Sequence, residues 1–231
     1  MAIAILLAAG TGNRFNDSIP KQLIELHGKP VIEHSLEVLY EHDLIDEIIL
    51  VVSKDLSARV REISQPYARK VKKIIEGGNT RSESSFSGLK SIETVENPKI
   101  LIHDSARPFI SAEMISACIE ALDAYEAVSV AVPSKETTFE VEGSEVLRIP
   151  SRDSLMRAQT PQGFRLQRIV EAHKKLKTDK LFSPTDDCGV IAKYFPKIPI
   201  GVIPGSEKNI KITFPEDILT AQAILRDENL H

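Results

Sequence analysis

The residues best suited to chemistry lie near the amino terminus, directly after an apolar run from Ala2 to Leu7. Small residues and glycines occupy positions 8–12, and Arg14 and Lys21 follow. Small side chains let the backbone approach a ligand closely, and glycine permits turns that aim several N–H groups at one point. An apolar run that stops at glycine is typical of a strand buried on both faces. The pattern therefore predicts a strand followed by a phosphate-binding loop.

The spacing of these glycines excludes the two commonest nucleotide motifs. The dinucleotide fingerprint requires a third glycine near Phe15, and no Gly-Lys-Ser/Thr closes the loop as in a Walker sequence. The segment instead resembles the nucleotidyltransferase signature, Leu-x-Ala-Gly-x-Gly-x-Arg followed shortly by Pro-Lys, here residues 7–14 and 20–21. The alternative is a tight strand-to-helix turn with an incidental arginine and lysine.

Two further polar segments follow predicted strands. In residues 77–84 a double glycine could let a flat base lie against the backbone, although a turn with a helix cap would give the same pattern. In residues 103–108, Asp104 could bind Mg²⁺, a hard cation that prefers carboxylate, water and phosphate oxygens. An aspartate that satisfies backbone N–H groups in the turn fits Asp104 equally well. His103 is expected to be a hydrogen-bonded structural residue.

The elements between these segments must position them. Apolar strands are predicted at residues 2–7, 45–52, 71–75, 99–102 and 127–132. Amphipathic helices are predicted at residues 31–40, 56–63 and 81–92 and after Ser111. This alternation predicts an α/β fold with a mostly parallel, twisted sheet and helices on both faces. Ligands bind at the carboxyl ends of such strands, so the loops at residues 8–21, 53–55, 77–81 and 103–108 should form one site.

The pattern changes at Pro133. Short alternating runs at residues 137–141 and 146–149 predict a β-hairpin that projects from the main sheet. A two-stranded hairpin is marginally stable in water, so we expect this arm, residues 134–156, to pack on a second subunit. A helix at 166–176, a strand at 198–203 and a last helix at 215–226, opened by a Thr213–Glu216 capping box, follow. Residues 1–231 are predicted to form a single domain with one arm.

Composition excludes several classes of protein. The chain has 231 residues and a formal net charge of −4, whereas binding to a nucleic-acid backbone requires a basic face. Two cysteines, Cys118 and Cys188, are too few for a disulfide framework. No basic region precedes the first apolar run, and no stretch approaches the ~18 apolar residues of a membrane span. We therefore expect a cytoplasmic protein with no nucleic-acid or membrane partner.

Jointly, the motifs resemble the cytidylyltransferase family that includes 2-C-methyl-D-erythritol 4-phosphate cytidylyltransferase and ribitol-5-phosphate cytidylyltransferase. The matching segments run in family order over nearly the whole chain, at residues 7–14, 20–22, 77–81, 103–108, 152, 159–162, 185–187 and 209–213. The resemblance implies a Rossmann-like sheet and a homodimer with exchanged arms. It also implies CTP and Mg²⁺ as reactants and pyrophosphate as product.

The resemblance also implies roles for individual residues. The catalytic cations would be Arg14, Lys21 and Lys211. The nucleotide would be bound by Leu7, Ala8, Ala9, Gly10, Thr11, Gly12, Gly78, Asn79, Arg81, Ser84, Asp104 and Ser105. Asp104 would also lie by the metal. The acceptor would face Arg107, Thr137, Arg152 and Asp186, of which Thr137 and Arg152 come from the arm of the neighbouring subunit.

The identity of the acceptor depends on features that disagree. Methylerythritol enzymes usually carry Asp-Thr-x-Lys on the arm, where this chain has no lysine at residues 136–139. Residues 149–152 and Cys188 look more like the ribitol branch, whereas residues 8–9 and 185–187 look more like the methylerythritol branch. Ribitol 5-phosphate is the predicted acceptor and 2-C-methyl-D-erythritol 4-phosphate the alternative. A transferase for another nucleotide and a non-catalytic nucleotide-binding module are further alternatives.

Overall fold

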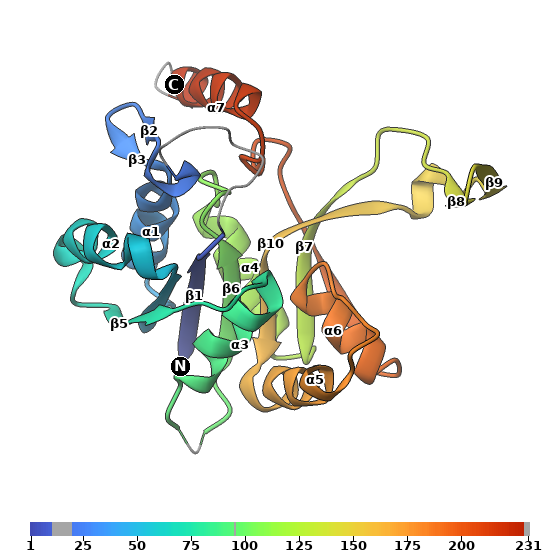
Figure 1. Cartoon of the computed structure of the whole chain (residues 1–231), viewed down its shortest axis with the longest axis horizontal. Helices are drawn as coiled ribbons and strands as arrows, with labels where there is room; N and C mark the ends of the chain where they lie inside the picture. The colour runs from blue at the N-terminus through green and yellow to red at the C-terminus, as the bar shows by residue number, and fades with distance from the viewer. Residues whose placement is uncertain (11–19, 95, 229–231) are drawn as a thin grey trace.

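The computed structural model describes residues 1–10, 20–94 and 96–228, and its centre is a seven-stranded sheet of order β11-β7-β10-β6-β1-β4-β5 (Figure 1). The strands are β1 (Ala2–Ala8), β4 (Glu47–Val52), β5 (Val71–Glu76), β6 (Lys99–Asp104), β7 (Ala127–Pro133), β10 (Met156–Arg165) and β11 (Ile200–Pro204). Within the described part of the chain, β10 alone runs antiparallel to its neighbours in this sheet. The predicted α/β fold with a mostly parallel sheet is therefore confirmed.

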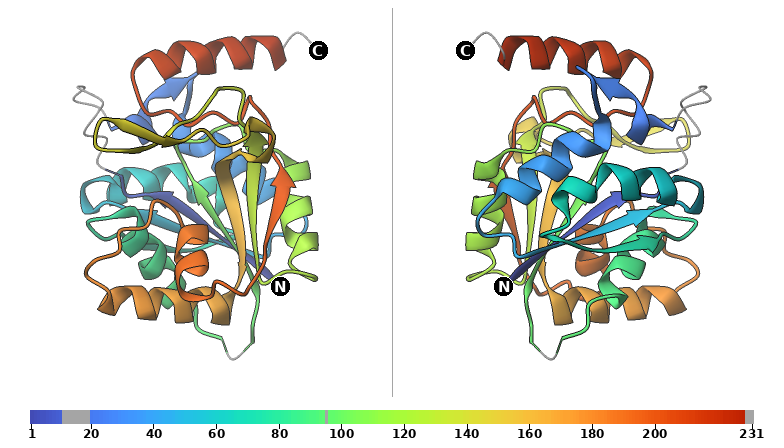
Figure 2. Two further views of the ribbon diagram at one scale, coloured as in Figure 1. Left: turned by 90° about the vertical axis from the view of Figure 1, so that its right-hand side faces the viewer. Right: turned by 90° about the vertical axis from the view of Figure 1, so that its left-hand side faces the viewer.

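The central strand β1 is buried on both faces, and its alternating side chains enter two separate cores. Ala4 and Leu6 pack with α1 (Val31–Glu41), α2 (Ser57–Ile63) and α4 (Ala112–Ala121) on one face. Ile3 and Ile5 pack on the other face with α3 (Arg81–Lys90), α5 (Leu166–Thr178) and α6 (Asp187–Tyr194). Figure 2 shows these helices on both sides of the twisted sheet. Burial on both faces explains why the strand reads as an uninterrupted apolar run.

A third, smaller core closes the carboxyl edge of the sheet. The last helix, α7 (Glu216–Glu228), packs on the short strand pair β2 (Glu25–Leu26) and β3 (Lys29–Pro30). The predicted capping box at its start is wrong. The Asp217 carboxylate, not Glu216, accepts hydrogen bonds there, from the N–H groups of Thr213 at 2.7 Å and Phe214 at 2.8 Å. A carboxylate within the first turn satisfies the same exposed donors from one position further along the chain.

The two longest elements that the sequence did not predict are β10 and α6. Pro161 argues against a central strand because it cannot donate to the ladder. The register of β10 with β7 shifts between Ala158 and Gln162, so residues 159–161 leave the ladder and the proline is accommodated. The eight residues of α6 are too few to show a clear helical period.

The predicted arm is present as a projecting hairpin of β8 (Glu140–Glu142) and β9 (Glu145–Arg148) (Figure 1). The first strand is shorter than predicted, and the second has the predicted length but begins one residue earlier. Large apolar side chains on the arm are at least half exposed in the single chain, namely Phe139, Val141, Val146, Leu147 and Ile149. Elsewhere, none of the helices in the described ranges has the length and apolar character that crossing a bilayer requires.

Replacing Gly88 by alanine tests how closely α3 packs on the sheet. The added Cβ would lie 2.8 Å from Cγ2 of Ile5 and 3.1 Å from Cγ2 of Val51. Both neighbours are buried and β-branched, and such side chains cannot easily change χ1. Gly88→Ala is therefore expected to lower the free energy of unfolding by about 1–3 kcal/mol, although alanine is the better helix former by about 1 kcal/mol. Urea unfolding of the purified protein measures the difference.

Ser87→Ala on the same helix is the matched control, because the Ser87 side chain is only partly buried. This variant is expected to be as stable as the unchanged protein or slightly more so. Equal stability of the Gly88→Ala protein would mean that the sheet absorbs the methyl group, contrary to the packing described.

Candidate active site

The carboxyl ends of β1, β4, β5 and β6 open onto one cavity of about 720 Å³. Its wall consists of residues 7, 9–10, 21–22, 53–54, 76–81, 84, 104–106, 185, 211 and 213. The loops that the sequence placed at one edge of the sheet therefore do meet. Lys21 and Lys211 reach this cavity from segments far apart in the chain.

Most of the predicted nucleotide-binding residues that the structure describes line the cavity: Leu7, Ala9, Gly10, Gly78, Asn79, Arg81, Ser84, Asp104 and Ser105. Ala8 does not, because alternation along β1 turns its side chain into the core. Thr11, Gly12 and Arg14 lie outside the described residues.

Gln22 anchors the start of the first loop, a role that was not predicted although the residue belongs to the Pro-Lys-Gln motif. Its buried side-chain amide donates to the carbonyl oxygens of Ala8 at 3.0 Å and Gly10 at 2.6 Å. The neighbouring Lys21 places its ammonium 3.2 Å from the carbonyl oxygen of Ile212. One short helical turn, η1 (Lys21–Leu23), thus ties the first loop to the segment that carries Lys211.

The double glycine lets the turn after β5 pack against the first loop. A Cβ on Gly77 would lie 2.4 Å from Cβ of Ala9, and one on Gly78 would lie 2.3 Å from Cβ of Glu83. Thr80 and Glu83 form a capping box that starts α3. The turn is therefore a helix cap, as one interpretation of the sequence held, and it also lines the cavity.

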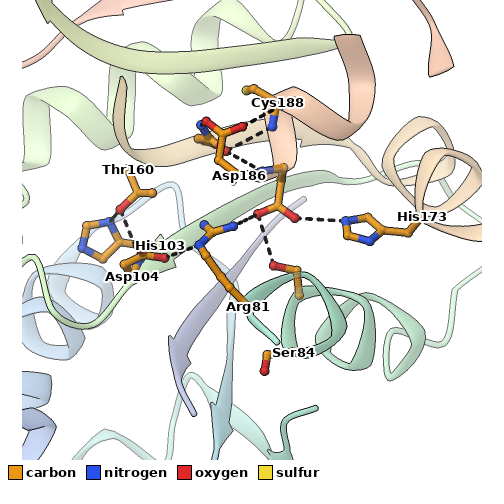
Figure 3. A network of polar contacts seen from close by, with 12 residues as sticks. Arg81, Ser84, His103, Asp104, Thr160, His173, Asp186 and Cys188 are labelled. Atoms are coloured by element: carbon orange, nitrogen blue, oxygen red, sulfur yellow. Dashed lines mark hydrogen bonds and ion pairs between the residues drawn. The ribbon is translucent and has the colours of Figure 1, made fainter. Parts of the chain in front are cut away.

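Two cationic side chains, Arg81 and Lys211, form ion pairs with Asp104 and Asp187 at the centre of the site. Figure 3 shows Arg81 beside Asp104. The Arg81 guanidinium donates from Nε to Oδ1 of Asp104 at 2.9 Å and from Nη1 to Oδ2 of Asp187 at 2.7 Å. The Lys211 ammonium donates to Oδ2 of Asp104 at 2.6 Å. Both oxygens of the Asp104 carboxylate are thus paired with a cation.

The electrostatic environment keeps Asp104 ionised. Burial alone would raise the pKa of this carboxyl, but the positive charges of Arg81 and Lys211 outweigh burial and hold its pKa well below the ordinary range. The same balance lowers the pKa of Asp187, where Arg81 and His173 oppose the effect of burial. The site therefore contains two buried carboxylates that remain negative at neutral pH.

The residues around Asp104 fit a metal ion that arrives with a substrate. Within residues 1–10, 20–94 and 96–228, no cluster of three or more histidine, cysteine, aspartate or glutamate side chains could hold a metal ion by itself. Mg²⁺ commonly keeps several waters and binds through one or two carboxylates together with substrate phosphates. One ionised carboxylate at the wall of a cavity lined with lysines satisfies that requirement.

His103 supports Asp104 from behind and does not face the cavity. Burial lowers the pKa of His103 to about 4, so the imidazole is neutral at pH 7. Its Nε2 lies 3.0 Å from the carbonyl oxygen of Arg107 and must donate, which leaves Nδ1 to accept from the Thr160 hydroxyl at 3.0 Å. The hydroxyl oxygen of Thr160 in turn accepts from the backbone N–H of Asp104 at 3.1 Å. The histidine is structural in this arrangement.

The residues predicted to face the acceptor do not gather at the cavity within one chain. The Arg107 guanidinium donates to the carbonyl oxygen of Asn209 at 2.7 Å. The Asp186 carboxylate caps α6 and also accepts from Nε2 of Gln162 at 2.7 Å. Thr137 and Arg152 are exposed on the arm and do not line the cavity. The arm projects from the main sheet (Figure 1). A neighbouring residue, Thr185, does line the cavity.

Fold and cavity together define a nucleotidyltransferase, in which small-residue backbone and cations at the strand ends face a space large enough for a nucleotide. Comparison with known proteins agrees. Residues 2–227 match the family described as IspD: 2-C-methyl-D-erythritol 4-phosphate cytidylyltransferase. The chain therefore belongs to the IspD family of cytidylyltransferases, the family that the sequence motifs indicated.

Individual relatives support the same conclusion. The chain is 40% identical over 230 residues to 2-C-methyl-D-erythritol 4-phosphate cytidylyltransferase from Thermobifida fusca, covering 96% of this chain and 92% of the relative. It is 38% identical to the bifunctional ribulose 5-phosphate reductase/CDP-ribitol pyrophosphorylase Bcs1 from Haemophilus influenzae, covering 98% of this chain and 48% of that protein. The solved 4-diphosphocytidyl-2C-methyl-D-erythritol synthase from Anaerococcus prevotii has a TM-score of 0.88 at 34% identity, over 97% of this chain and 98% of that one.

Proposed function

We propose that this enzyme transfers CMP from CTP to 2-C-methyl-D-erythritol 4-phosphate and releases pyrophosphate. The observation that carries the proposal is the cavity itself, where Lys211 and Arg81 pair with an ionised Asp104 and Lys21 lines the same wall. Such a site favours a substrate with several phosphates. The family match supports CTP as that substrate.

The proposed acceptor, 2-C-methyl-D-erythritol 4-phosphate, is chosen because of the relatives. The arm sequence by itself favoured ribitol 5-phosphate. Seven of the eight curated relatives compared are described as 2-C-methyl-D-erythritol 4-phosphate cytidylyltransferases, and so is the family. Ribitol 5-phosphate remains the second candidate for two reasons. The arm lacks the lysine usual in methylerythritol enzymes, and the Haemophilus relative is described as a CDP-ribitol pyrophosphorylase.

The proposed reaction requires cations more than it requires a base. The nucleophile is a phosphomonoester oxygen, which is already anionic at neutral pH because the second pKa of the phosphate is ~6. It attacks the α-phosphorus of CTP in line and pyrophosphate leaves. The difficulty is to bring two anions together and to stabilise charge on the transferring phosphoryl group. Lys21 and Lys211 both line the cavity, which supports this role for them.

Asp104 is the residue that would bind Mg²⁺. Bound there, the ion would neutralise charge on the triphosphate oxygens. Lys211 and Arg81 both pair with the Asp104 carboxylate, so the Lys211 ammonium lies at the group that would hold the ion. Arg81 keeps Oδ1 of Asp104 oriented from the buried side.

We further propose that the arm completes the site of a second copy of the chain. Exposed apolar side chains, which include Val141, Leu147 and Ile149, favour a protein interface. Arg152 lies on the same arm. Among the residues that the structure describes, its guanidinium makes one hydrogen bond, a long one of 3.4 Å to the carbonyl oxygen of Lys135. A cation presented in this way suits the phosphate of an acceptor bound by the partner.

Pyrophosphate release with each acceptor tests the proposed function. The purified enzyme with CTP and Mg²⁺ is expected to turn over with 2-C-methyl-D-erythritol 4-phosphate and to stop when EDTA is added. UTP and GTP serve as nucleotide controls. Turnover with ribitol 5-phosphate alone would reject the proposed acceptor and favour the second candidate. No turnover with either polyol phosphate would reject both.

Lys211→Ala tests the role of the cation at Asp104. The variant is expected to lose turnover by roughly 10²-fold, because a positioned cation acts on charge that develops in the transition state. Steady-state kinetics at saturating substrates measures the loss. Lys208→Ala is the control, since Lys208 pairs with Asp227 on the exposed surface. Normal turnover of the Lys211→Ala enzyme would remove this residue from the mechanism.

Mixed dimers test whether Arg152 acts on the neighbouring subunit. Lys211→Ala and Arg152→Ala chains with different tags are co-expressed, and the mixed species is purified through both tags. An arm that acts in the partner's site leaves one site with both residues, so the mixed species should regain turnover that neither variant has alone. If Arg152 served its own chain, both sites would stay defective and no turnover would return.

A further inference from the structure

We propose that His173 and Asp187 are positioning residues for the nucleotide site, which act from outside the cavity by fixing the Arg81 guanidinium against Asp104. Neither His173 nor Asp187 lines the cavity. The inference rests on the proposed use of CTP at this cavity. It assigns a role to a buried pair that the reaction described above leaves unexplained.

Asp187 is held by donors from two helices. Its Oδ1 lies 3.0 Å from Nε2 of His173 on α5. Its Oδ2 accepts from Nη1 of Arg81 at 2.7 Å and from the Ser85 hydroxyl at 3.1 Å, both on α3. An ionised carboxylate can only accept, so Nε2 of His173 must carry the proton in this contact. Three donors leave the Asp187 carboxylate a single orientation.

The orientation of Asp187 determines that of Arg81. The guanidinium is rigid and planar, so a bond from Nη1 to Asp187 fixes the direction in which Nε meets Asp104. Among the described residues, the buried Nη2 of Arg81 has no hydrogen-bond partner. Leaving a buried donor unpaired is unfavourable, yet the guanidinium keeps this position. Its contacts with the two carboxylates therefore set where it lies, and hydrogen bonding of all five of its N–H groups does not.

The contacts of His173 separate its two possible roles. The imidazole donates to Asp187 through Nε2, and its ring stacks on Phe86 with centroids 5.5 Å apart and planes 5° from parallel. A residue that only fills space between α3 and α5 would act through the stacked ring. A positioning residue would act through the N–H group. Different substitutions remove these two features.

His173→Phe keeps an aromatic ring against Phe86 and removes the donor to Asp187. His173→Gln keeps an N–H donor and removes the aromatic ring. Affinity for CTP in the presence of Mg²⁺ is measured by calorimetry without any acceptor. The Phe variant is expected to bind CTP about tenfold more weakly, by analogy with the loss of a hydrogen-bond partner behind a metal ligand. The Gln variant is expected to bind within about threefold of the unchanged enzyme.

A second measurement observes Arg81 itself. The ¹⁵N–¹H signal of the Arg81 Nε–H group, assigned by its loss in an Arg81→Lys protein, is expected to be protected from exchange in the unchanged and Gln proteins and broadened in the Phe protein. Ile169→Val, a buried change on α5, controls for simple destabilisation and should leave both measurements unchanged. Asp187→Asn removes the negative charge that pairs with Arg81, so it is expected to broaden the Arg81 signal as the Phe variant does.

The outcomes separate the inference from the proposed function. A Phe variant with unchanged CTP affinity and an unchanged Arg81 signal would overturn the positioning role, and so would a Gln variant as defective as the Phe variant. If the unchanged protein bound no CTP, the proposed function would fail. The Arg81 signal would still decide whether His173 and Asp187 position the guanidinium.

Discussion

A guanidinium shared between two buried carboxylates connects the fold of this protein to its candidate active site. Arg81 lies at the first position of α3, Asp104 at the last position of β6, and Asp187 at the first position of α6. Removing one partner from a buried ion pair costs about 3–5 kcal/mol, because a charge is left without compensation. The three elements are therefore difficult to displace separately. The charged groups beside the cavity between these elements are therefore held in a fixed arrangement.

The sheet makes this arrangement possible, because parallel strands end at one edge. β1 and β6 pair in register from Ala2 with Lys99 to Leu7 with Asp104, which brings the first loop and Asp104 side by side. The antiparallel β10 then crosses behind this edge. Its Thr160 binds the backbone of Asp104, and its Gln162 accepts from the N–H groups of Asp187 and Cys188. A strand that contributes little to the cavity wall thus supports both carboxylates.

Local sequence patterns predicted the parts of this site that depend on neighbouring residues. Apolar runs marked the strands, and the residues after them marked the loops that meet at the cavity. Features that depend on distant contacts were missed. Arg81 and Asp187 are 106 positions apart, and nothing beside Asp187 indicates its partner. β10 was missed because a proline, Pro161, argues against a strand when only its neighbours in the sequence are considered. The proline is tolerated because residues 159–161 do not pair with β7, and this gap in the pairing depends on the other strands of the sheet.

The two cations on Asp104 differ in a way that suits different tasks. The side chain of Lys211 is 39% exposed, whereas that of Arg81 is 24% exposed and also pairs with the buried Asp187. If Lys211 turned from Asp104 toward a phosphate, Arg81 would still compensate the carboxylate and no buried charge would be left alone. If Arg81 turned away, Asp187 would lose its only ion-pair partner among the arginine and lysine side chains described. Moving Lys211 away from Asp104 therefore costs less free energy than moving Arg81.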